Sequence, residues 1–414
     1  MKDIYVARQP IFDAAQSVVA YELLYRSNGE TQFADGLTAS RMSSSVIVDG
    51  VLGMGLDSLT EGQTAFINLS EDMLLQGTAE LLDPSQVVIE LLESIQPTEQ
   101  VIEECTSLHA AGYKLALDDF VYDESWDPLL ELAEIVKVDV LDTGSAMPEA
   151  LERLRRFDVL LLAEKVEDQA IHDRCVEQGF KYFQGFHYYR PETLTKKDMS
   201  SQSLAIVRLM NLLQNPGVTD REIEDAFKSD PSLTYKLLRI VNSAALGGRG
   251  VDSIAHALRL LGRDPLYRWL CLLLMTVGSD GGDLQTEVVK AALLRGRMCE
   301  SVGDRVRSKV RDTPGGGSLF LIGMFSDIER VLGLPVSDVL EDIDVAPSVR
   351  SAILERDGTG GTILSAVDAY MDAEWDEAEG ALAGVGAETD GLFDVYVDSV
   401  TWAGERMAFR KDGL

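Results

Sequence analysis

Polar side chains end nearly every short apolar run in the first 190 residues. Two adjacent carboxylates, Asp118 and Asp119, follow the run KLAL. Like charges held about 4 Å apart repel by roughly 4 kcal/mol at an effective dielectric near 20. Other runs end in or near Glu22, Asn68, Glu90, Lys137, Glu164 and Gln184. Oxygen-rich sets of this kind select Mg²⁺, Mn²⁺ or Ca²⁺, so we expect them to hold divalent metal ions.

The elements that must position these residues follow a regular order. Apolar runs at 64–70, 86–94, 114–120, 134–140, 158–167 and 181–186 predict strands, and amphipathic stretches such as 99–112 and 127–135 predict helices. This alternation predicts βα units, whereas the first two runs, joined by DAAQ, predict a local hairpin. In a closed (β/α) barrel the carboxyl ends of all parallel strands meet at one face. Such a barrel would bring the polar residues together.

A second domain follows the polar stretch PETLTKKDMSSQS at 191–203. We place the boundary so that the first domain spans residues 1–195 and the second spans 196–414. Helix-start signals predict that the second domain is all-α: a capping box from Thr219 to Glu222, Asp230 before a proline, and Ser253. The glycine-rich stretches at 313–318 and 357–361 predict a flexible connection and a turn.

The composition restricts the partners. A net charge of −32 argues against bulk nucleic acid, which requires clustered Lys and Arg. The chain shows no signal segment, and its longest apolar stretch, at 269–277, is too short to span a bilayer. We therefore expect a cytoplasmic protein without a membrane partner. The four cysteines are widely spaced and indicate neither a zinc site nor a disulfide framework.

The strand-end residues form motifs in a fixed order. They are E-x-L-x-R at Glu22, Leu24 and Arg26, N-x-S at Asn68, E-x-x-E at Glu90, DDF at Asp118, K-x-D at Lys137, A-E-x-V-E at Glu164 and Glu167, and Q-G-x5-P at Gln184. Order and spacing resemble those of EAL domains, barrel phosphodiesterases that hydrolyse cyclic di-GMP to pGpG. The resemblance implies a TIM-like (β/α) barrel of the EAL type.

The resemblance also implies a role for each residue. Two Mg²⁺ or Mn²⁺ ions would be held by Glu22, Asn68, Glu90, Asp118, Asp119 and Glu164. Catalysis would involve Lys137, which positions or deprotonates the attacking water, together with Glu22 and Glu164. Cyclic di-GMP would be bound by Arg26, at a ligand phosphate, and by Leu24, Gln184 and Glu167. A homodimer is implied by the resemblance alone.

The second domain resembles the HDOD domain, a helical relative of HD phosphohydrolases. The stretch SDPSLTYKLLRIVNSAALG at 229–247 carries this resemblance. HD enzymes bind metal through several histidines and a His-Asp pair, but His256 is the single histidine after residue 197, and Ser326 precedes Asp327 where histidine would stand. The resemblance implies a C-terminal all-α module that docks an unidentified signalling protein. EAL followed by HDOD resembles the YuxH-type group of bacterial signalling proteins.

Two features of the barrel domain leave the function open. Active EAL enzymes follow DDF with a glycine-containing loop, whereas this chain has Val121, Tyr122 and Asp123. Stiff and bulky residues there predict misaligned aspartates and weak hydrolysis. We weigh two hypotheses: a metal-dependent phosphodiesterase, and a receptor or scaffold that binds nucleotide and acts through a partner. His172 and Asp173, a further conspicuous pair, are predicted on a helix surface.

Overall fold

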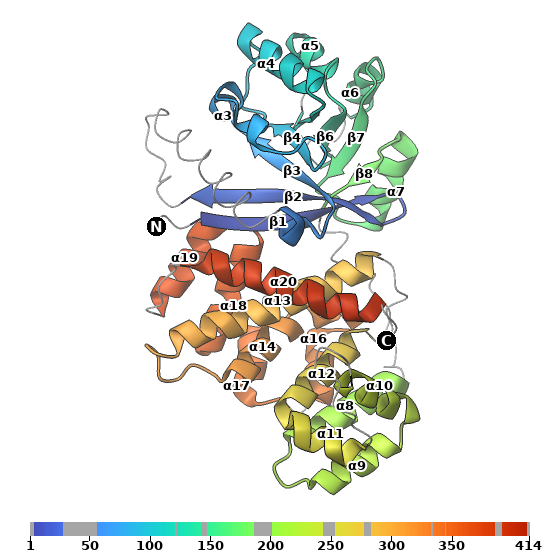
Figure 1. Cartoon of the computed structure of the whole chain (residues 1–414), viewed down its shortest axis with the longest axis vertical. Coiled ribbons are helices and arrows are strands. Elements are labelled where there is room, and N and C mark those ends of the chain that lie inside the picture. The colour runs from blue at the N-terminus through green and yellow to red at the C-terminus, as the bar shows by residue number, and fades with distance from the viewer. Residues whose placement is uncertain are drawn as a thin grey trace.

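The computed structural model describes residues 4–27, 56–120, 122–141, 147–185, 201–242, 253–276, 283–332, 334–343, 345–385 and 391–411. Figure 1 shows a strand-rich domain above a helical one. The predicted fold class, an α/β barrel followed by an all-α domain, is confirmed. The predicted boundary at residue 195 lies outside the described residues.

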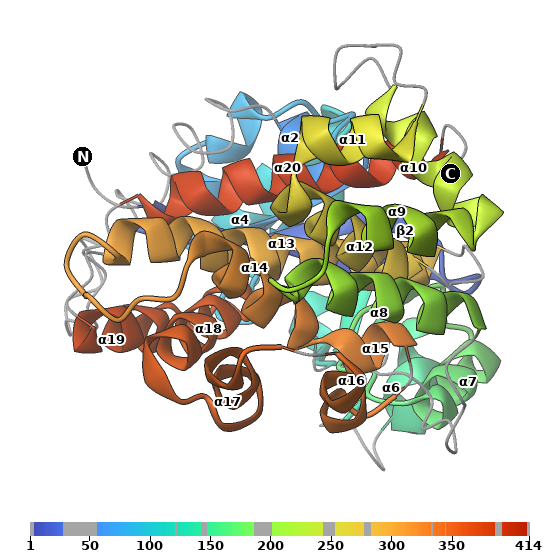
Figure 2. The same ribbon diagram turned by 90° about the horizontal axis from the view of Figure 1, so that it is seen from below.

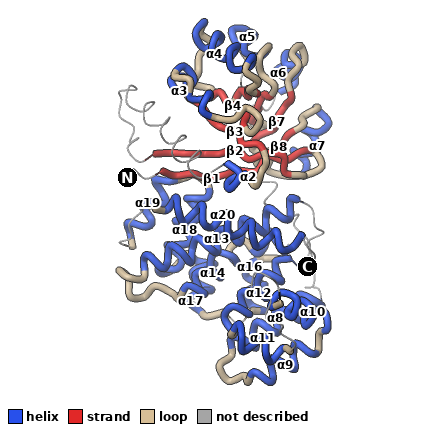
Figure 3. The backbone as a smooth tube through the Cα atoms, in the orientation of Figure 1, coloured by secondary structure: helices blue, strands red, loops and turns tan. Residues whose placement is uncertain are grey.

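The first domain is a closed barrel of eight strands, drawn in red in Figure 3. They are β1 (Ile4–Asp13), β2 (Val18–Ser27), β3 (Thr64–Leu69), β4 (Val87–Leu91), β5 (Lys114–Leu117), β6 (Ile135–Asp139), β7 (Leu160–Glu164) and β8 (Tyr182–Phe183). Strands β2 to β8 run parallel, and β1 is antiparallel to β2 and β8. The predicted hairpin is confirmed.

Short helices cover the outside of the barrel. They are α2 (Leu56–Thr60), α3 (Glu71–Leu75), α4 (Glu99–Ala110), α5 (Asp127–Leu130), α6 (Met147–Leu154) and α7 (Gln169–Gln178). The side chains of Thr98 and Asp168 cap the longer helices α4 and α7 by accepting backbone N–H groups of the first turn. Their buried residues, among them Val101, Cys105 and Cys175, belong to the hydrophobic cluster of the barrel.

The inward side chains of the barrel form two layers. An apolar layer consists of Ile11, Ala20, Phe66, Val88, Ala116, Ile135 and Leu162, with Tyr182 packed against it. Because side chains alternate with a period of two, the next inward position lies two residues later on each parallel strand and two residues earlier on antiparallel β1. These positions are Gln9, Glu22, Asn68, Glu90, Asp118, Lys137, Glu164 and Gln184. We call them the polar layer.

The second domain is helical throughout its described part. Its helices are α8 (Ser201–Gln214), α9 (Asp220–Lys228), α10 (Pro231–Val241), α11 (Ile254–Leu261), α12 (Arg263–Thr276), α13 (Asp283–Val306), α14 (Gly316–Phe325), α15 (Ile328–Leu332), α16 (Val336–Asp342), α17 (Pro347–Glu355), α18 (Gly358–Met371), α19 (Trp375–Gly384) and α20 (Leu392–Lys411). The predicted caps at Thr219, Asp230 and Ser253 are confirmed. Helices α13 and α20 lie side by side (Figure 1 and Figure 2).

Two predictions for this domain hold only in part, because residues 313–315 and 357 do lie between helices. The glycine-rich stretches expected to form a flexible connection and a turn each contain the start of a helix, α14 at Gly316 and α18 at Gly358. Helix α18 packs against α14 so closely that a Cβ on Gly360 would lie 2.8 Å from Ile322 Cδ1. The next residue is more restricted, because a Cβ on Gly361 would lie 2.1 Å from the backbone carbonyl carbon of Arg356. Glycine therefore fits this first turn despite its low helix propensity.

Among the residues that the structure describes, no helix combines the length and the apolar composition needed to cross a bilayer.

The two domains meet at β1 and β2. Tyr5 and Ala7 belong to the hydrophobic cluster of the helical domain, and the ring centroid of Tyr5 lies 5.8 Å from that of Tyr370 and 6.2 Å from that of Trp375. The buried Tyr396 hydroxyl accepts the backbone N–H of Arg8 at 3.0 Å. The first strand of the barrel is therefore also part of the core of the helical domain.

A charged network crosses the same junction. Arg8 Nη2 lies 3.0 Å from Glu61 Oε1, and Lys290 Nζ lies 2.5 Å from Glu61 Oε2 and 2.7 Å from Glu287 Oε1. The Arg8 guanidinium also stacks 4.5 Å from the ring centroid of Tyr21. Helix α13 is thus tied to the barrel through Glu61, which lies just beyond α2.

We predict that Tyr396→Phe lowers the free energy of unfolding of the full chain by about 1 to 3 kcal/mol, because it leaves the Arg8 N–H without its acceptor in a partly buried position. Urea denaturation followed by circular dichroism measures the change. Tyr235→Phe is the matched control, since Tyr235 is 63% exposed. An equal effect of both substitutions would contradict this role of Tyr396.

Candidate active site

The Lys137 amine lies at the centre of the polar layer and is 1% exposed. Its Nζ atom is 2.9 Å from Asp118 Oδ1, 2.9 Å from Glu164 Oε1 and 3.3 Å from Glu22 Oε2, and it also contacts Glu90 Oε1. Carboxylates from β2, β4 and β7 and from the end of β5 thus surround the Lys137 amine, which β6 carries. Charges buried this deeply are stable only when they are paired.

Two amide side chains orient Glu22. Asn68 Nδ2 donates to Glu22 Oε1 at 2.9 Å, and Gln184 Nε2 donates to Glu22 Oε2 at 2.8 Å. Gln184 Nε2 also donates to Gln9 Oε1 at 2.7 Å. Every strand of the barrel therefore supplies one residue to a connected polar layer.

The electrostatics of the layer follow from burial and crowding. Burial and the neighbouring Glu22 charge raise the pKa of Glu90 well above its usual range. Burial also opposes ionisation of Glu22, but Lys137 and the hydrogen bonds from Gln184 and Asn68 outweigh it and lower the pKa of that carboxyl. Burial disfavours the charged amine of Lys137, yet the surrounding carboxylates raise its pKa.

Glu164 in the polar layer and Asp119 beside it also experience neighbouring negative charge. Burial and the charge of Asp118 raise the pKa of Glu164 to about 7, against the opposing effect of Lys137. Burial and Asp118 also raise the pKa of Asp119. One ammonium does not balance the carboxylates gathered here, so the layer favours an added cation.

The backbone holds the two aspartates at a sharp turn. The Asp118 N–H donates to Leu91 O on β4 at 3.0 Å, and the Phe120 N–H donates to Lys137 O on β6 at 3.1 Å. Between them Asp119 has φ +42°, a left-handed conformation that few residues other than glycine adopt. The turn therefore lies between two strands that each bear a member of the polar layer.

The remaining predicted residues lie around this centre. Leu24, at the next inward position after Glu22, is half-buried and packs against the hydrophobic cluster of the helical domain. Glu167 is half-buried between β7 and α7. Arg26 belongs to β2, but its side chain lies outside the described part of the structure. None of these three is among the residues shown to contact Lys137.

The expectation that His172 lies on the surface is wrong. His172 is 5% exposed, and its ring centroid lies 4.7 Å from that of Phe183, whereas the Asp173 side chain is 63% exposed. The imidazole therefore packs between α7 and Phe183 of β8 and is not part of the polar layer.

Three residues near the site were missed from the sequence. Gln9 belongs to the polar layer, the Tyr25 hydroxyl donates to Asn68 O, and Lys165 forms an ion pair with Asp139 Oδ2. Gln9 stands two residues before Ile11, where an antiparallel strand places it at the mouth. The predicted hairpin contains this signal, because an antiparallel strand brings a residue before its end to the mouth.

The polar layer fits a divalent cation by its donor set. Asn68 Oδ1 and Gln184 Oε1 are buried and accept no hydrogen bond from the residues that the structure describes. Oxygen atoms of amides and carboxylates are the ligands of Mg²⁺ and Mn²⁺. Within the described ranges no three acidic, histidine or cysteine side chains already share one metal position, because the carboxylates face Lys137. A bound ion would compete with Lys137 for them.

The helical domain carries a different charged cluster. Asp327, which follows Ser326, lies 2.5 Å from Arg295 Nη1, and Asp368 Oδ1 lies 2.6 Å from Arg295 Nε. Arg356 Nη2 lies 2.9 Å from Asp368 Oδ2. Guanidinium groups thus already balance the carboxylates at the position where the resemblance to HD enzymes would place metal ligands.

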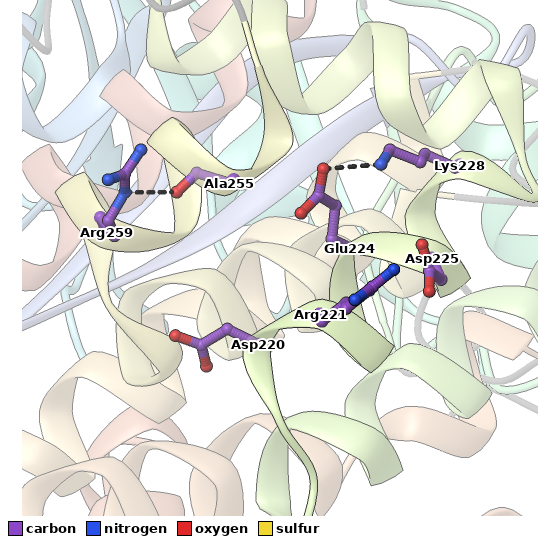
Figure 4. Close-up of a pocket in the computed structure, with 7 residues that line it drawn as sticks. All are labelled: Asp220, Arg221, Glu224, Asp225, Lys228, Ala255 and Arg259. Carbon is purple, nitrogen blue, oxygen red and sulfur yellow. Dashed lines mark hydrogen bonds and ion pairs between the residues drawn. The ribbon is translucent and has the colours of Figure 1, made fainter.

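A pocket of about 320 Å³ also lies in the helical domain, between α9 and α11 (Figure 4). The Lys228 amine on its wall pairs with Glu224 at 2.7 Å, and Arg259 Nε donates to Ala255 O at 3.1 Å. None of the predicted site residues lines this pocket, so it is separate from the polar layer.

Family models match both halves of the chain. The EAL domain matches residues 2–191, and the HDOD domain matches residues 199–337. The EAL match thus covers the barrel, and the HDOD match covers the helical domain from α8 into α16, whereas α17 to α20 lie beyond it.

Two curated relatives extend over nearly the whole chain. Uncharacterized protein YuxH of Bacillus subtilis is 28% identical over 409 residues, which cover 96% of this chain and 98% of that protein. Cyclic di-GMP phosphodiesterase CdgJ of Vibrio cholerae is 29% identical over 415 residues, which cover 97% of this chain and 93% of that protein.

Solved EAL structures match the barrel region more distantly. The Bacillus subtilis YkuI protein, in complex with c-di-GMP and calcium, is 20% identical with a TM-score of 0.38, covering 56% of this chain and 72% of that chain. The EAL domain of Mycobacterium smegmatis DcpA is 21% identical with a TM-score of 0.34, covering 44% of this chain and 91% of that chain. The family models and the full-length relatives together show that the chain is an EAL–HDOD protein.

Proposed function

We propose that this chain binds cyclic di-GMP at the carboxyl ends of the barrel strands and hydrolyses it to pGpG. The observation that carries the proposal is the polar layer, in which four carboxylates and three amides converge around the Lys137 amine. The identity of the substrate is suggested by the match to the EAL family and by the relative named as a cyclic di-GMP phosphodiesterase.

Two Mg²⁺ or Mn²⁺ ions would be held by Glu22, Asn68, Glu90, Asp118, Asp119 and Glu164. Bound divalent ions would lower the pKa of water and neutralise charge on the reacting phosphate. The protein's part is to hold these oxygens in place, and Asn68 and Gln184 do so for Glu22.

Lys137 would position the attacking water and the phosphate. Its amine is surrounded by carboxylates, which favour the protonated form. A charged ammonium cannot remove a proton, so of the two roles that the resemblance allows, positioning fits this geometry better than deprotonation. Arg26, Leu24, Gln184 and Glu167 would bind the nucleotide. The cytoplasmic location and the homodimer stay predictions from the sequence.

We propose that the HDOD domain regulates this site through β1 and β2. Neighbouring residues of β1 face the two domains: Arg8 contacts Tyr396 while Gln9 contacts Gln184. Leu24, expected at the nucleotide, packs against the helical core. A protein partner of the helical domain would therefore act on the same strand that carries Glu22. This proposal predicts that a partner alters turnover without touching the barrel.

The alternative is a receptor or scaffold that binds nucleotide without efficient turnover. Two observations favour it: the loop after DDF lacks the glycines of active enzymes, and the helical domain balances its carboxylates with arginine. Both hypotheses need the polar layer for binding, so turnover distinguishes them.

The first prediction here concerns turnover. Pure full-length protein incubated with cyclic di-GMP and Mn²⁺ should yield pGpG, measured by liquid chromatography. Glu22→Gln keeps the shape of the side chain but removes a charge that holds the ions, so turnover should fall by about a hundredfold or more. Glu103→Gln on the exposed side of α4 is the control. Nucleotide binding by the wild type without any pGpG would establish the receptor alternative.

The second prediction concerns the charge at the centre. Lys137→Met leaves four carboxylates without their shared cation, so in EDTA the free energy of unfolding should fall by about 3 to 5 kcal/mol. Mn²⁺ should restore more stability to this variant than it adds to the wild type. Lys181→Met is the control, because Lys181 is exposed. Thermal unfolding with and without Mn²⁺ measures both effects, and a Lys137→Met protein as stable as the wild type in EDTA would contradict the pairing.

A further inference from the structure

The segment that follows the two aspartates is anchored by the side chain of Tyr122. Its hydroxyl donates to Asp127 Oδ1 at 2.9 Å and accepts from Arg156 Nη2 at 2.5 Å. The Arg153 guanidinium lies 5.0 Å from the ring centroid, and the Phe120 ring meets the Tyr122 ring edge-on at 6.4 Å. Groups at α5 and at the end of α6 thus converge on one side chain in this loop.

Phe120 links this anchor to the site. Its side chain is 7% exposed within the hydrophobic cluster of the barrel, and its ring also meets Trp126 edge-on at 5.7 Å. Its backbone N–H donates to Lys137 O. Phe120, directly after Asp119, therefore contacts Tyr122 through its ring and β6 through its backbone N–H.

The aspartates need such an anchor. The left-handed φ of +42° at Asp119 is unfavourable for a residue with a Cβ and persists only when surrounding contacts hold it. A glycine-containing loop would leave the path of the chain to the backbone alone. Here the described residues after the turn fix the path by side-chain contacts. Asp123 adds a further one by accepting the Ser125 N–H at 2.9 Å.

We propose that Tyr122 is a positioning residue for Asp118 and Asp119, doing through its ring and hydroxyl what a glycine-containing loop does in other members of the family. The proposal rests on the proposed function, because it concerns the metal-binding aspartates of that site. It reverses the expectation that the bulky loop residues weaken hydrolysis. Val121 lies outside the described residues and has no part in it.

A merely stabilising role for Tyr122 is the competing explanation. The ring packs at the surface of the barrel, so its loss could lower stability without changing the site. Metal affinity separates the two roles, because a stabilising residue does not alter the affinity of a site that remains folded. Mn²⁺ binding by calorimetry, without nucleotide, is therefore the main readout, and turnover is the second.

The experiment uses three variants of the full chain. Tyr122→Ala removes ring and hydroxyl, Tyr122→Phe restores the ring, and Arg156→Met removes the cation that donates to the hydroxyl. Tyr235→Ala, at a tyrosine of α10 that is 63% exposed, is the matched control. Thermal unfolding is recorded for each, so that affinity is compared only between folded proteins.

We expect Tyr122→Ala to weaken Mn²⁺ binding by about tenfold and to lower kcat by about ten- to a hundredfold with little change in KM, as substitutions behind metal ligands do. Tyr122→Phe should recover most of both, and Arg156→Met should weaken Mn²⁺ binding by about threefold. Wild-type Mn²⁺ affinity in Tyr122→Ala would overturn the proposal, as would wild-type affinity in Arg156→Met if Tyr122→Ala does not fold.

The outcome also separates this proposal from the proposed function. A wild type that binds Mn²⁺ but forms no pGpG would end the phosphodiesterase proposal, while a weaker Mn²⁺ affinity in Tyr122→Ala would still support the positioning role. A wild type that binds no Mn²⁺ would overturn both.

Discussion

The buried ammonium of Lys137 among four carboxylates is the interaction on which the rest of the barrel depends. Each carboxylate taken from water requires a nearby opposite charge, and partners only a few ångströms farther away would leave several kcal/mol uncompensated. The carboxylates come from Glu22, Glu90, Asp118 and Glu164 on four different strands. A one-residue slip of any of these strands would turn its polar residue out of the barrel, so the pairing also defines the strand register.

The same requirement explains the apolar layer beneath. Each parallel strand places an apolar residue two positions before its polar one, as Val88 precedes Glu90 and Ile135 precedes Lys137. The apolar side chains exclude water from below and keep the charges at the mouth, where the loops and the helical domain border them. Burial is deep enough to shift the pKa values of Glu90 and Glu164 upward, yet the layer remains at the face where a ligand can enter. Burial therefore disfavours the ionised form of carboxylates that the site holds close together.

The sequence predicted the barrel, the hairpin, the helical second domain and most of the polar layer, because a period of two and a polar strand end are local features. It did not reveal Gln9, whose place depends on the antiparallel direction of β1. The burial of His172 depends on which face of α7 meets Phe183, and Gly360 in the first turn of α18 lies close to Ile322 of α14. Contacts between distant segments decided each of these cases. The packing of Leu24 against the helical domain is of the same kind.

The two domains treat clustered carboxylates in opposite ways, and the difference in charge bears on their functions. In the barrel four carboxylates share one ammonium, so the site keeps an excess of negative charge that a divalent cation would relieve. In the helical domain Asp327 and Asp368 contact the guanidinium groups of Arg295, Arg330 and Arg356, so each of these carboxylates has its own arginine partners. A planar guanidinium bonded to both carboxylates is also harder to displace than a single ammonium shared by several groups. The charge balance is therefore consistent with the proposal that places metal binding in the barrel and not at Asp327.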